Sequence, residues 1–152
     1  MRRKESQIKE ISEIEGIIRK ATVCRIALCE NDKPYLVPVC FGYADHTLYF
    51  HSAPEGKKLD ILRKNNNVCF EMEIDTSAVE NDKACAWSFR YKSVIGYGKA
   101  LFVKDPALKQ KALEIILSQY SNRKFEIPEN ELRKTEVLKV EIDEITGKKS
   151  GH

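Results

Sequence analysis

Hydrophobic and polar positions follow two different periods along this chain, which divide it into a helical start and a β-rich body. In the first segment, isoleucines recur at spacings of three and four with charged residues between them, at Ile8, Ile11, Ile14, Ile17 and Ile18. This stripe predicts an amphipathic helix over about residues 5–22 that covers a hydrophobic core.

From Val23 onwards, short runs of β-branched and aromatic residues are separated by turn-forming residues, a pattern that predicts strands. The expected strands cover about residues 23–30, 35–43, 47–52 and 68–74, a long β-prone stretch over 86–103, and a last strand over 135–142. The turn residues lie at 31–34, 45–46 and 65–67.

Helices are expected only at the margins of this β-rich body. Asp105 and Pro106 offer an N-cap and a first-turn proline, which predicts a helix over 105–121, and a linker with Pro128 follows. The tail over 147–152 is expected to be disordered. The chain is therefore predicted to be a single domain over 1–152, mainly β with marginal α helices, built as a closed or split antiparallel barrel rather than an alternating βαβ fold.

Composition excludes several classes of protein. Hydrophobic residues make up 42% and charged residues 32% of the 152 positions, an ordinary globular balance. The net charge of +3 is spread along the chain, so no nucleic-acid binding is predicted. No apolar run has the length of a membrane span and the N-terminus is charged, which predicts no membrane association and a cytoplasmic location.

The five cysteines have neither a Cys-x-x-Cys spacing nor histidines at metal-ligand spacing, so no metal site is predicted. Each lies in an apolar, strand-like stretch. We interpret them as small buried hydrophobic residues in a reducing compartment, with a catalytic thiol as the alternative.

The stretch from Thr47 to Leu62 carries the most chemical information, because a strand there runs directly into a helix. Ser52 and Glu55 have the spacing of a capping box, with Pro54 in the first turn. A helix N-terminus attracts anions, and Lys57 and Lys58 beside it could complete a phosphate site. The alternative is an ordinary capped helix with two solvated lysines.

Three segments together resemble a known family. They are Pro38-Val39-Cys40-Phe41-Gly42-Tyr43, the run from Tyr49-Phe50-His51-Ser52-Ala53 to Gly56-Lys57-Lys58, and Arg90-Tyr91-Lys92-Ser93-Val94-Ile95-Gly96-Tyr97-Gly98. They resemble the pyridoxamine 5′-phosphate oxidase-like split-barrel flavoproteins, in particular the Nim-type 5-nitroimidazole resistance branch. The resemblance covers nearly the whole chain and implies a six-stranded split barrel that forms a homodimer, with FMN in two clefts at the dimer interface.

The resemblance also implies roles for residues in the first half of the chain. Val37, Pro38 and Val39 lie where the family places a strand along the flavin ring. His51 and Ser52 match the contact with the ribityl chain and phosphate, while Lys57 and Lys58 match the basic pair that binds the phosphate. His51 is also the candidate catalytic residue, since a histidine near the flavin is linked to substrate handling in the Nim branch; the alternative is a histidine that only satisfies a backbone group.

Two further cofactor contacts are expected in the second half. Ser93 stands where pyridoxamine phosphate oxidases present a polar side chain, usually glutamine, to the cofactor, and its alternative is an exposed strand residue. Trp87, the only tryptophan, could cover the flavin or substrate cleft, or could belong to the core or an interface.

These resemblances lead to three functional hypotheses. The first is a flavin-dependent reductase that takes electrons from NAD(P)H or another donor and passes them to a small aromatic acceptor such as a nitroimidazole. The second is a flavin-binding redox module without turnover. The third is a split barrel that binds haem or a deazaflavin; FAD could also replace FMN. Vitamin B6 oxidation is not expected, since the basic C-terminal segment of true pyridoxamine phosphate oxidases has no counterpart here.

Overall fold

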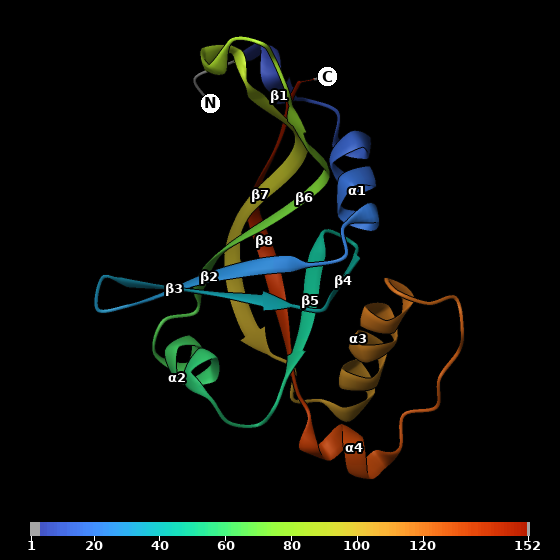
Figure 1. Ribbon diagram of the computed structural model, residues 1–152. Coiled ribbons are helices and arrows are strands. Elements are labelled where there is room, and N and C mark those ends of the chain that lie inside the picture. The colour runs from blue at the N-terminus through green and yellow to red at the C-terminus, as the bar shows by residue number, and fades with distance from the viewer. Residues whose placement is uncertain (1–3, 152) are drawn as a thin grey trace.

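The computed structural model describes residues 4–151 and shows a strongly bent antiparallel sheet with helices packed around it (Figure 1). The strands are β1 (Gln7–Ile8), β2 (Cys24–Glu30), β3 (Lys33–Val39), β4 (Phe41–Ala44), β5 (Thr47–Ser52), β6 (Asn67–Val79), β7 (Ser88–Phe102) and β8 (Glu136–Ser150). The helices are α1 (Ile11–Lys20), α2 (Lys57–Lys64), α3 (Pro106–Ser118) and α4 (Glu129–Lys134), with short 3-10 turns η1 (Lys4–Ser6) and η2 (Ala84–Ala86).

The strand order explains why the sheet has the shape of a split barrel. Strands pair in the order β3-β2-β6-β7-β8-β5-β4, and β1 pairs with the outer part of β8. β3 and β4 are thus the two ends of the path, yet only Cys40 separates them in the chain. The two edges must therefore approach each other at that point, while the barrel stays unclosed because no hydrogen bonds join them. The predicted mainly β split barrel is confirmed, with eight strands rather than six.

Several predicted boundaries need correction. The stretch predicted as one strand over 35–43 is two strands, because the chain changes sheet edge at Cys40. The first helix is limited to Ile11–Lys20, and Ile8 belongs instead to β1. The linker around Pro128 contains the short helix α4.

The expected disordered tail is wrong for residues 147–150, which are the last part of β8; His152 lies outside the described residues. This polar stretch forms a strand because it has a partner on each side, with Lys148 opposite both Gln7 and Ser93. Gly147 also allows close packing, since an added Cβ would lie 2.9 Å from atoms of both Ile8 and Ile14. Backbone pairing, rather than hydrophobic alternation, therefore decides the structure here.

Two clusters of buried side chains hold the fold together. The larger fills the barrel and includes the fully buried rings of Phe41, Phe50 and Phe70, with the isoleucine face of α1 packed against it. The smaller lies between α3, α4 and the outer side of β8 around Val137, with Tyr49 of β5 against it. α3 approaches β4 so closely that a Cβ at Gly42 would lie 2.6 Å from the backbone of Ile115. As a result, β5 packs against the larger cluster on one face, through Phe50, and against the smaller cluster on the other, through Tyr49.

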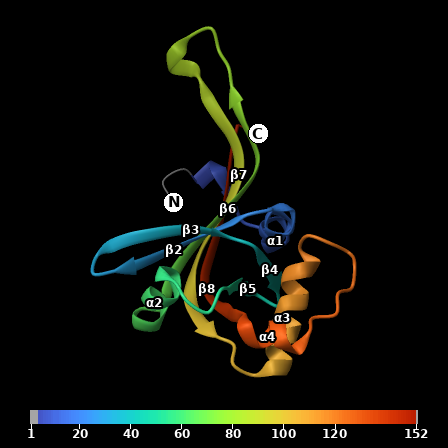
Figure 2. The same cartoon turned by 60° about the horizontal axis from the view of Figure 1, so that its bottom comes forward.

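A long β-hairpin arm projects from the barrel. It consists of the outer parts of β6 and β7 with η2 at its tip, and Figure 2 shows it extending well beyond the body of the molecule. The sequence predicted that β6 ends near residue 74, whereas the strand continues to Val79 through an irregularity between Ile74 and Ser77. All ten residues from Asn81 to Arg90 are exposed, so nothing within this chain covers the tip.

Candidate functional site

One end of the barrel brings together the end of β5 and the start of α2. His51 and Ser52 are the last two residues of β5, and α2 begins five residues later at Lys57. The predicted capping box is wrong: the N-cap is Gly56, with φ of 131°, and no side chain caps the helix. Ser52 is held in the β5–β8 ladder opposite Glu136 and does not cap the helix, so the helix start is left open.

The two lysines that begin α2 lie over aromatic rings. The Lys57 Nζ is 4.6 Å from the centroid of the Tyr35 ring, and the Lys58 Nζ is 5.6 Å from that of Phe50. Within residues 4–151 neither lysine forms an ion pair. Lys58 is half-buried, and its burial lowers its pKa. A cation that is partly removed from water and lacks a counter-charge is a good partner for an anion.

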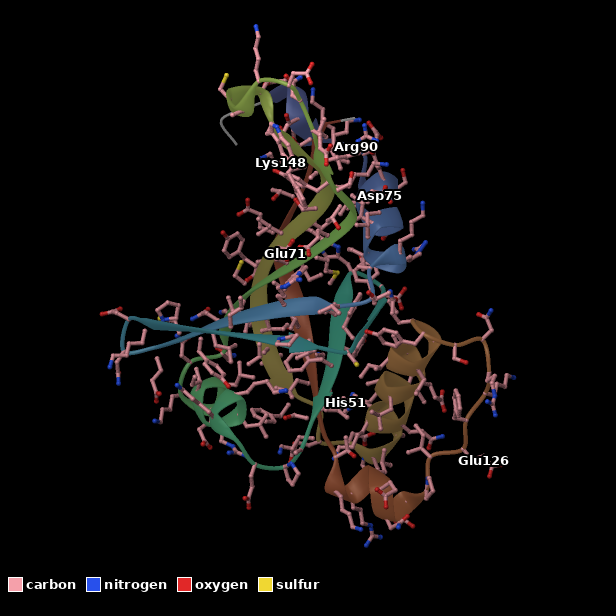
Figure 3. All side chains as sticks on the ribbon, viewed as in Figure 1. His51, Glu71, Asp75, Arg90, Glu126 and Lys148 are labelled. Carbon is pink, nitrogen blue, oxygen red and sulfur yellow. The ribbon has the colours of Figure 1, made fainter. Side chains whose placement is uncertain are left out.

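His51 lies close to this cation. Its side chain keeps an exposed face, but the surrounding protein and then the charge of Lys58 lower its pKa below 6.5. The imidazole is therefore neutral at neutral pH and can donate one hydrogen bond and accept another. Figure 3 places it on β5, in the lower part of the barrel.

β3 contributes an open sheet edge, since within residues 4–151 its one strand partner is β2. Val39 is buried and Val37 half-buried, both packed in the barrel core, so neither offers its side chain to a ligand outside the barrel. Pro38 is exposed on the opposite face, as expected for a proline that donates no ladder hydrogen bond. A ring lying along β3 would thus meet backbone atoms and Pro38.

The remaining two predicted contacts lie elsewhere in the chain. Ser93 is on the outer face of β7, opposite Glu73, with 9% of its surface exposed. Trp87 directly follows η2 on the arm; it is 54% exposed and its Nε1 donates to the Asn81 carbonyl oxygen at 2.7 Å. It is therefore not a core residue. A single chain does not bring Trp87 and the α2 lysines together.

The cysteines differ in burial, contrary to the interpretation of all five as buried residues. Cys24 is buried and burial raises its pKa, whereas Cys40 and Cys85 are exposed. Cys40 is exposed because it links two sheet edges instead of belonging to a strand, and Cys85 because it lies at the tip of the arm. Among residues 4–151, no group of His, Cys, Asp and Glu side chains is arranged to hold a metal ion.

A cluster on the outer sheet face was missed by the sequence reasoning. Arg25 Nη1 donates to Glu71 Oε2 at 3.1 Å and to the Glu73 carboxylate at 3.0 Å. Burial, then the neighbouring Glu73 carboxyl, raise the pKa of Glu71 to about 7. The i, i+2 spacing of Glu71 and Glu73 in a predicted strand was the available signal, because it places both carboxylates on one face.

Comparison with known proteins agrees with this architecture. The model of the pyridoxamine 5′-phosphate oxidase family matches residues 10–149. A crystal structure of a proposed 5-nitroimidazole antibiotic resistance protein from Bacteroides thetaiotaomicron is 37% identical, with a TM-score of 0.85 over 93% of this chain and 85% of that one. A FAD and haem binding protein from Mycobacterium smegmatis has a TM-score of 0.87 over 97% of this chain and 74% of its own, at 19% identity, and shows the fold alone.

A curated protein of Rhizobium meliloti (strain 1021), not characterised in function, is 33% identical over 60 residues, and the match spans 39% of its length. The fold and the matches define the class of this protein as an antiparallel split barrel. Since the family model covers most of the chain, it belongs to the pyridoxamine 5′-phosphate oxidase family, and its similarity to the Bacteroides protein matches the Nim-like branch. Among the described residues, no helix is long and apolar enough to cross a membrane.

Proposed function

We propose that this protein binds FMN, with the phosphate at the open start of α2. The observation that carries the proposal is the half-buried, unpaired Lys58 cation beside Lys57 and an uncapped helix N-terminus. A phosphate there would accept hydrogen bonds from both ammonium groups and from free backbone N–H groups. Ser52 and the neutral His51 lie at the end of the adjacent strand, where they could contact the ribityl chain.

The ring would extend along β3, past Pro38. Bound FMN would supply the electron or hydride transfer, while the chain supplies the phosphate anchor and a sheet edge to orient the ring. FMN ends in a single phosphate, and the proposed site at the start of α2 would bind one terminal phosphate. FMN is therefore favoured over FAD.

We further infer that the protein acts as a homodimer, for which the outer sheet face gives the physical support. Leu36, Ile95 and Tyr97 are 60%, 39% and 51% exposed. Leu36 and Tyr97 lie in one cross-strand row, and Pro38 and Ile95 are the ends of the next row, with the Arg25–Glu71 ion pair between them. We call Leu36, Pro38, Ile95 and Tyr97 the outer apolar patch. A second copy on the patch would remove it from water, and would bring a second chain to the open flavin edge.

The activity that fits best is a flavin-dependent reduction of a small aromatic acceptor, with a reduced nicotinamide as electron donor. Its support is the 37% identity to the Bacteroides protein, whose description concerns 5-nitroimidazole resistance. The second candidate, a flavin-binding module without turnover, is supported by the position of His51 at the end of β5, where it would contact the ribityl chain rather than the ring. The cytoplasm, with its supply of reduced nicotinamide, would suit the reductase.

Replacing Lys57 and Lys58, the two lysines that begin α2, tests the proposed phosphate site. A Lys57→Ala/Lys58→Ala double variant should raise the Kd of FMN roughly 10²- to 10⁴-fold, because it removes two charge-assisted contacts of about 1.5–3 kcal/mol each. Riboflavin, which has no phosphate, should bind the variant and the natural chain equally. Titration by flavin fluorescence quenching measures both.

A Lys111→Ala/Lys124→Ala variant has the same loss of charge at two exposed positions away from the sheet and should keep the affinity of the natural chain. Equal FMN affinity in all three proteins would place the phosphate elsewhere.

A substitution in the outer apolar patch tests whether this surface forms the homodimer interface. Ile95→Asp should convert the dimer to monomers in sedimentation velocity, because it places a carboxylate in a desolvated interface, and should weaken FMN binding although both lysines remain. Leu108→Asp alters an exposed leucine on α3, outside the patch, and should remain dimeric. A monomeric natural chain that retains FMN tightly would contradict the dimer.

Turnover is tested by anaerobic reduction of the flavin-loaded protein followed by addition of an acceptor. A 5-nitroimidazole should reoxidise the flavin, measured by the return of its visible absorption, whereas the same imidazole without the nitro group should not. If neither does, and NAD(P)H is not consumed in steady state, the flavin module without turnover is the correct function.

A further inference from the structure

We propose that the arm is an interaction surface for a second copy of this chain, turned end to end with the first. In the homodimer, the arm of each copy then lies on its partner, which shields Trp87 and Phe89 from water. This inference rests on the homodimer of the proposed function and not on flavin binding. It gives Trp87 a place, since a single chain brings this residue neither into the core nor to Lys57 and Lys58.

The outer end of the arm has little support from its own chain. Within residues 4–151, β8 accompanies the arm only as far as Ser150, which pairs with Tyr91, and beyond this pair β6 and β7 form a two-stranded hairpin. Such a hairpin is marginally stable in water unless a third strand or a packed surface supports it. The outer end of the arm therefore lacks a packing partner in the single chain.

Two aromatic side chains on this outer end are available for contact with another surface. Trp87 is 54% and Phe89 51% exposed, and the hydrogen bond from Trp87 Nε1 to the Asn81 carbonyl oxygen holds the indole in place. The polar group of the indole is thereby satisfied, and its ring face is left apolar. Tryptophan is enriched among the residues that contribute most to the binding free energy of protein–protein interfaces.

The arm continues the outer apolar patch along β7. The extra residue of the irregularity is on β6, so β7 alternates without interruption, and Phe89 lies on the same face of β7 as Ile95 and Tyr97. The patch has four residues, whereas a stable interface takes about 20–30 residues from each partner. A second copy seated on the patch therefore needs further contacts, and the exposed arm from Asn81 to Arg90 supplies them.

The arm and α2 lie at opposite ends of the molecule (Figure 1). β7 connects these ends: it starts on the arm, and the ring centroid of its last residue, Phe102, is 5.8 Å from the guanidinium carbon of Arg63 in α2. From Gly96, between the patch residues of β7, Trp87 and Phe102 are nine and six residues away, about 30 Å and about 20 Å at the rise of a strand. When a two-fold axis through the patch turns one copy end to end, its arm is thus long enough to reach the α2 end of the other.

Charge favours this direction over the other two-fold arrangement, in which the two arms lie side by side. Glu80 and Asp82 at the tip adjoin a single lysine, Lys83, and neither carboxylate forms an ion pair within residues 4–151. At the α2 end of β7, Lys99 and Lys104 are exposed. Arms side by side would bring two acidic tips together, whereas copies turned end to end bring each tip to the basic end of its partner.

Trp87 is the only tryptophan of the chain, so its fluorescence reports on the arm. In flavin-free protein, acrylamide should quench its emission at least about threefold less efficiently in the natural dimer than in the Ile95→Asp monomer, because the partner covers the indole. Dilution of the natural chain to monomers gives the same comparison without a substitution.

Equal quenching of Trp87 in dimer and monomer would overturn the role of the arm and leave the homodimer intact. A natural chain that is monomeric at every concentration would overturn both. Because flavin is absent from this measurement, a failure of FMN binding would contradict the flavin site alone.

A substitution on the arm tests its contribution to assembly. Phe89→Asp should raise the Kd of the dimer at least about tenfold in sedimentation velocity, because it places a carboxylate in a surface that the partner covers. Phe125→Asp is the matched control: it alters a phenylalanine that is 42% exposed on the loop between α3 and α4, and should leave the Kd unchanged. An unaltered Kd in Phe89→Asp would overturn the proposal.

Cross-linking tests the direction of the second copy. A Cys40→Ser chain leaves Cys85, at the tip of the arm, as its exposed cysteine. With Lys104→Cys added, a short bismaleimide should link Cys85 of one copy to position 104 of the other, which peptide mass spectrometry of the covalent dimer identifies. The Cys40→Ser chain alone should not be linked, since the two arm tips point in opposite directions. A link between the two Cys85 residues, or none from Cys85 to position 104, would overturn the end-to-end arrangement.

Discussion

The passage of the chain from β3 to β4 through the single residue Cys40 is the constraint on which the rest of this structure depends. β3 and β4 are the opposite ends of one sheet, so a connection of one residue requires the sheet to bend until its edges meet. The bend encloses the core around Phe41, Phe50 and Phe70. It also leaves β3 as an open edge at the side of the barrel, where a flat ligand can contact backbone.

The same bend explains the unusual state of Lys58. Its ammonium nitrogen lies 5.6 Å from the centroid of the Phe50 ring, where the surrounding protein removes part of the group from water without supplying a carboxylate. Stability alone would favour a paired or fully solvated lysine at this position. A chain that retains an unpaired cation beside an uncapped helix keeps these groups available for an anion, and this is the physical basis of the proposed phosphate anchor.

The outer face of the sheet has a different character. Its middle carries the outer apolar patch, and the Arg25–Glu71 ion pair lies in the same cross-strand row as Pro38 and Ile95. Because neighbouring strands align side chains in rows, a second copy seated on the patch would also cover this ion pair.

The sequence predicted the parts of the fold that depend on local patterns. The turns at Asn31-Asp32 and Asp45-His46 have positive φ at both residues, and β5 has the predicted bounds Thr47–Ser52. The polar end of β8 and the arm of β6 were missed because long-range pairing stabilises them. In the candidate site, Lys57 and Lys58 were predicted from a local motif and their phosphate contact stays a prediction, whereas the capping role of Ser52 was wrong because its pairing with β8 is not visible in the sequence. The contact of Arg25 with both Glu71 and Glu73 could not be predicted, because it depends on the register between β2 and β6.

The most direct test of the central claim is the near-ultraviolet and visible absorption spectrum of the freshly purified protein, followed by heat release and chromatography of whatever it carries. The account predicts the two bands of an oxidised flavin and the release of FMN, close to one per chain. Haem bands, a deazaflavin, or a colourless protein that takes up no added FMN would contradict it.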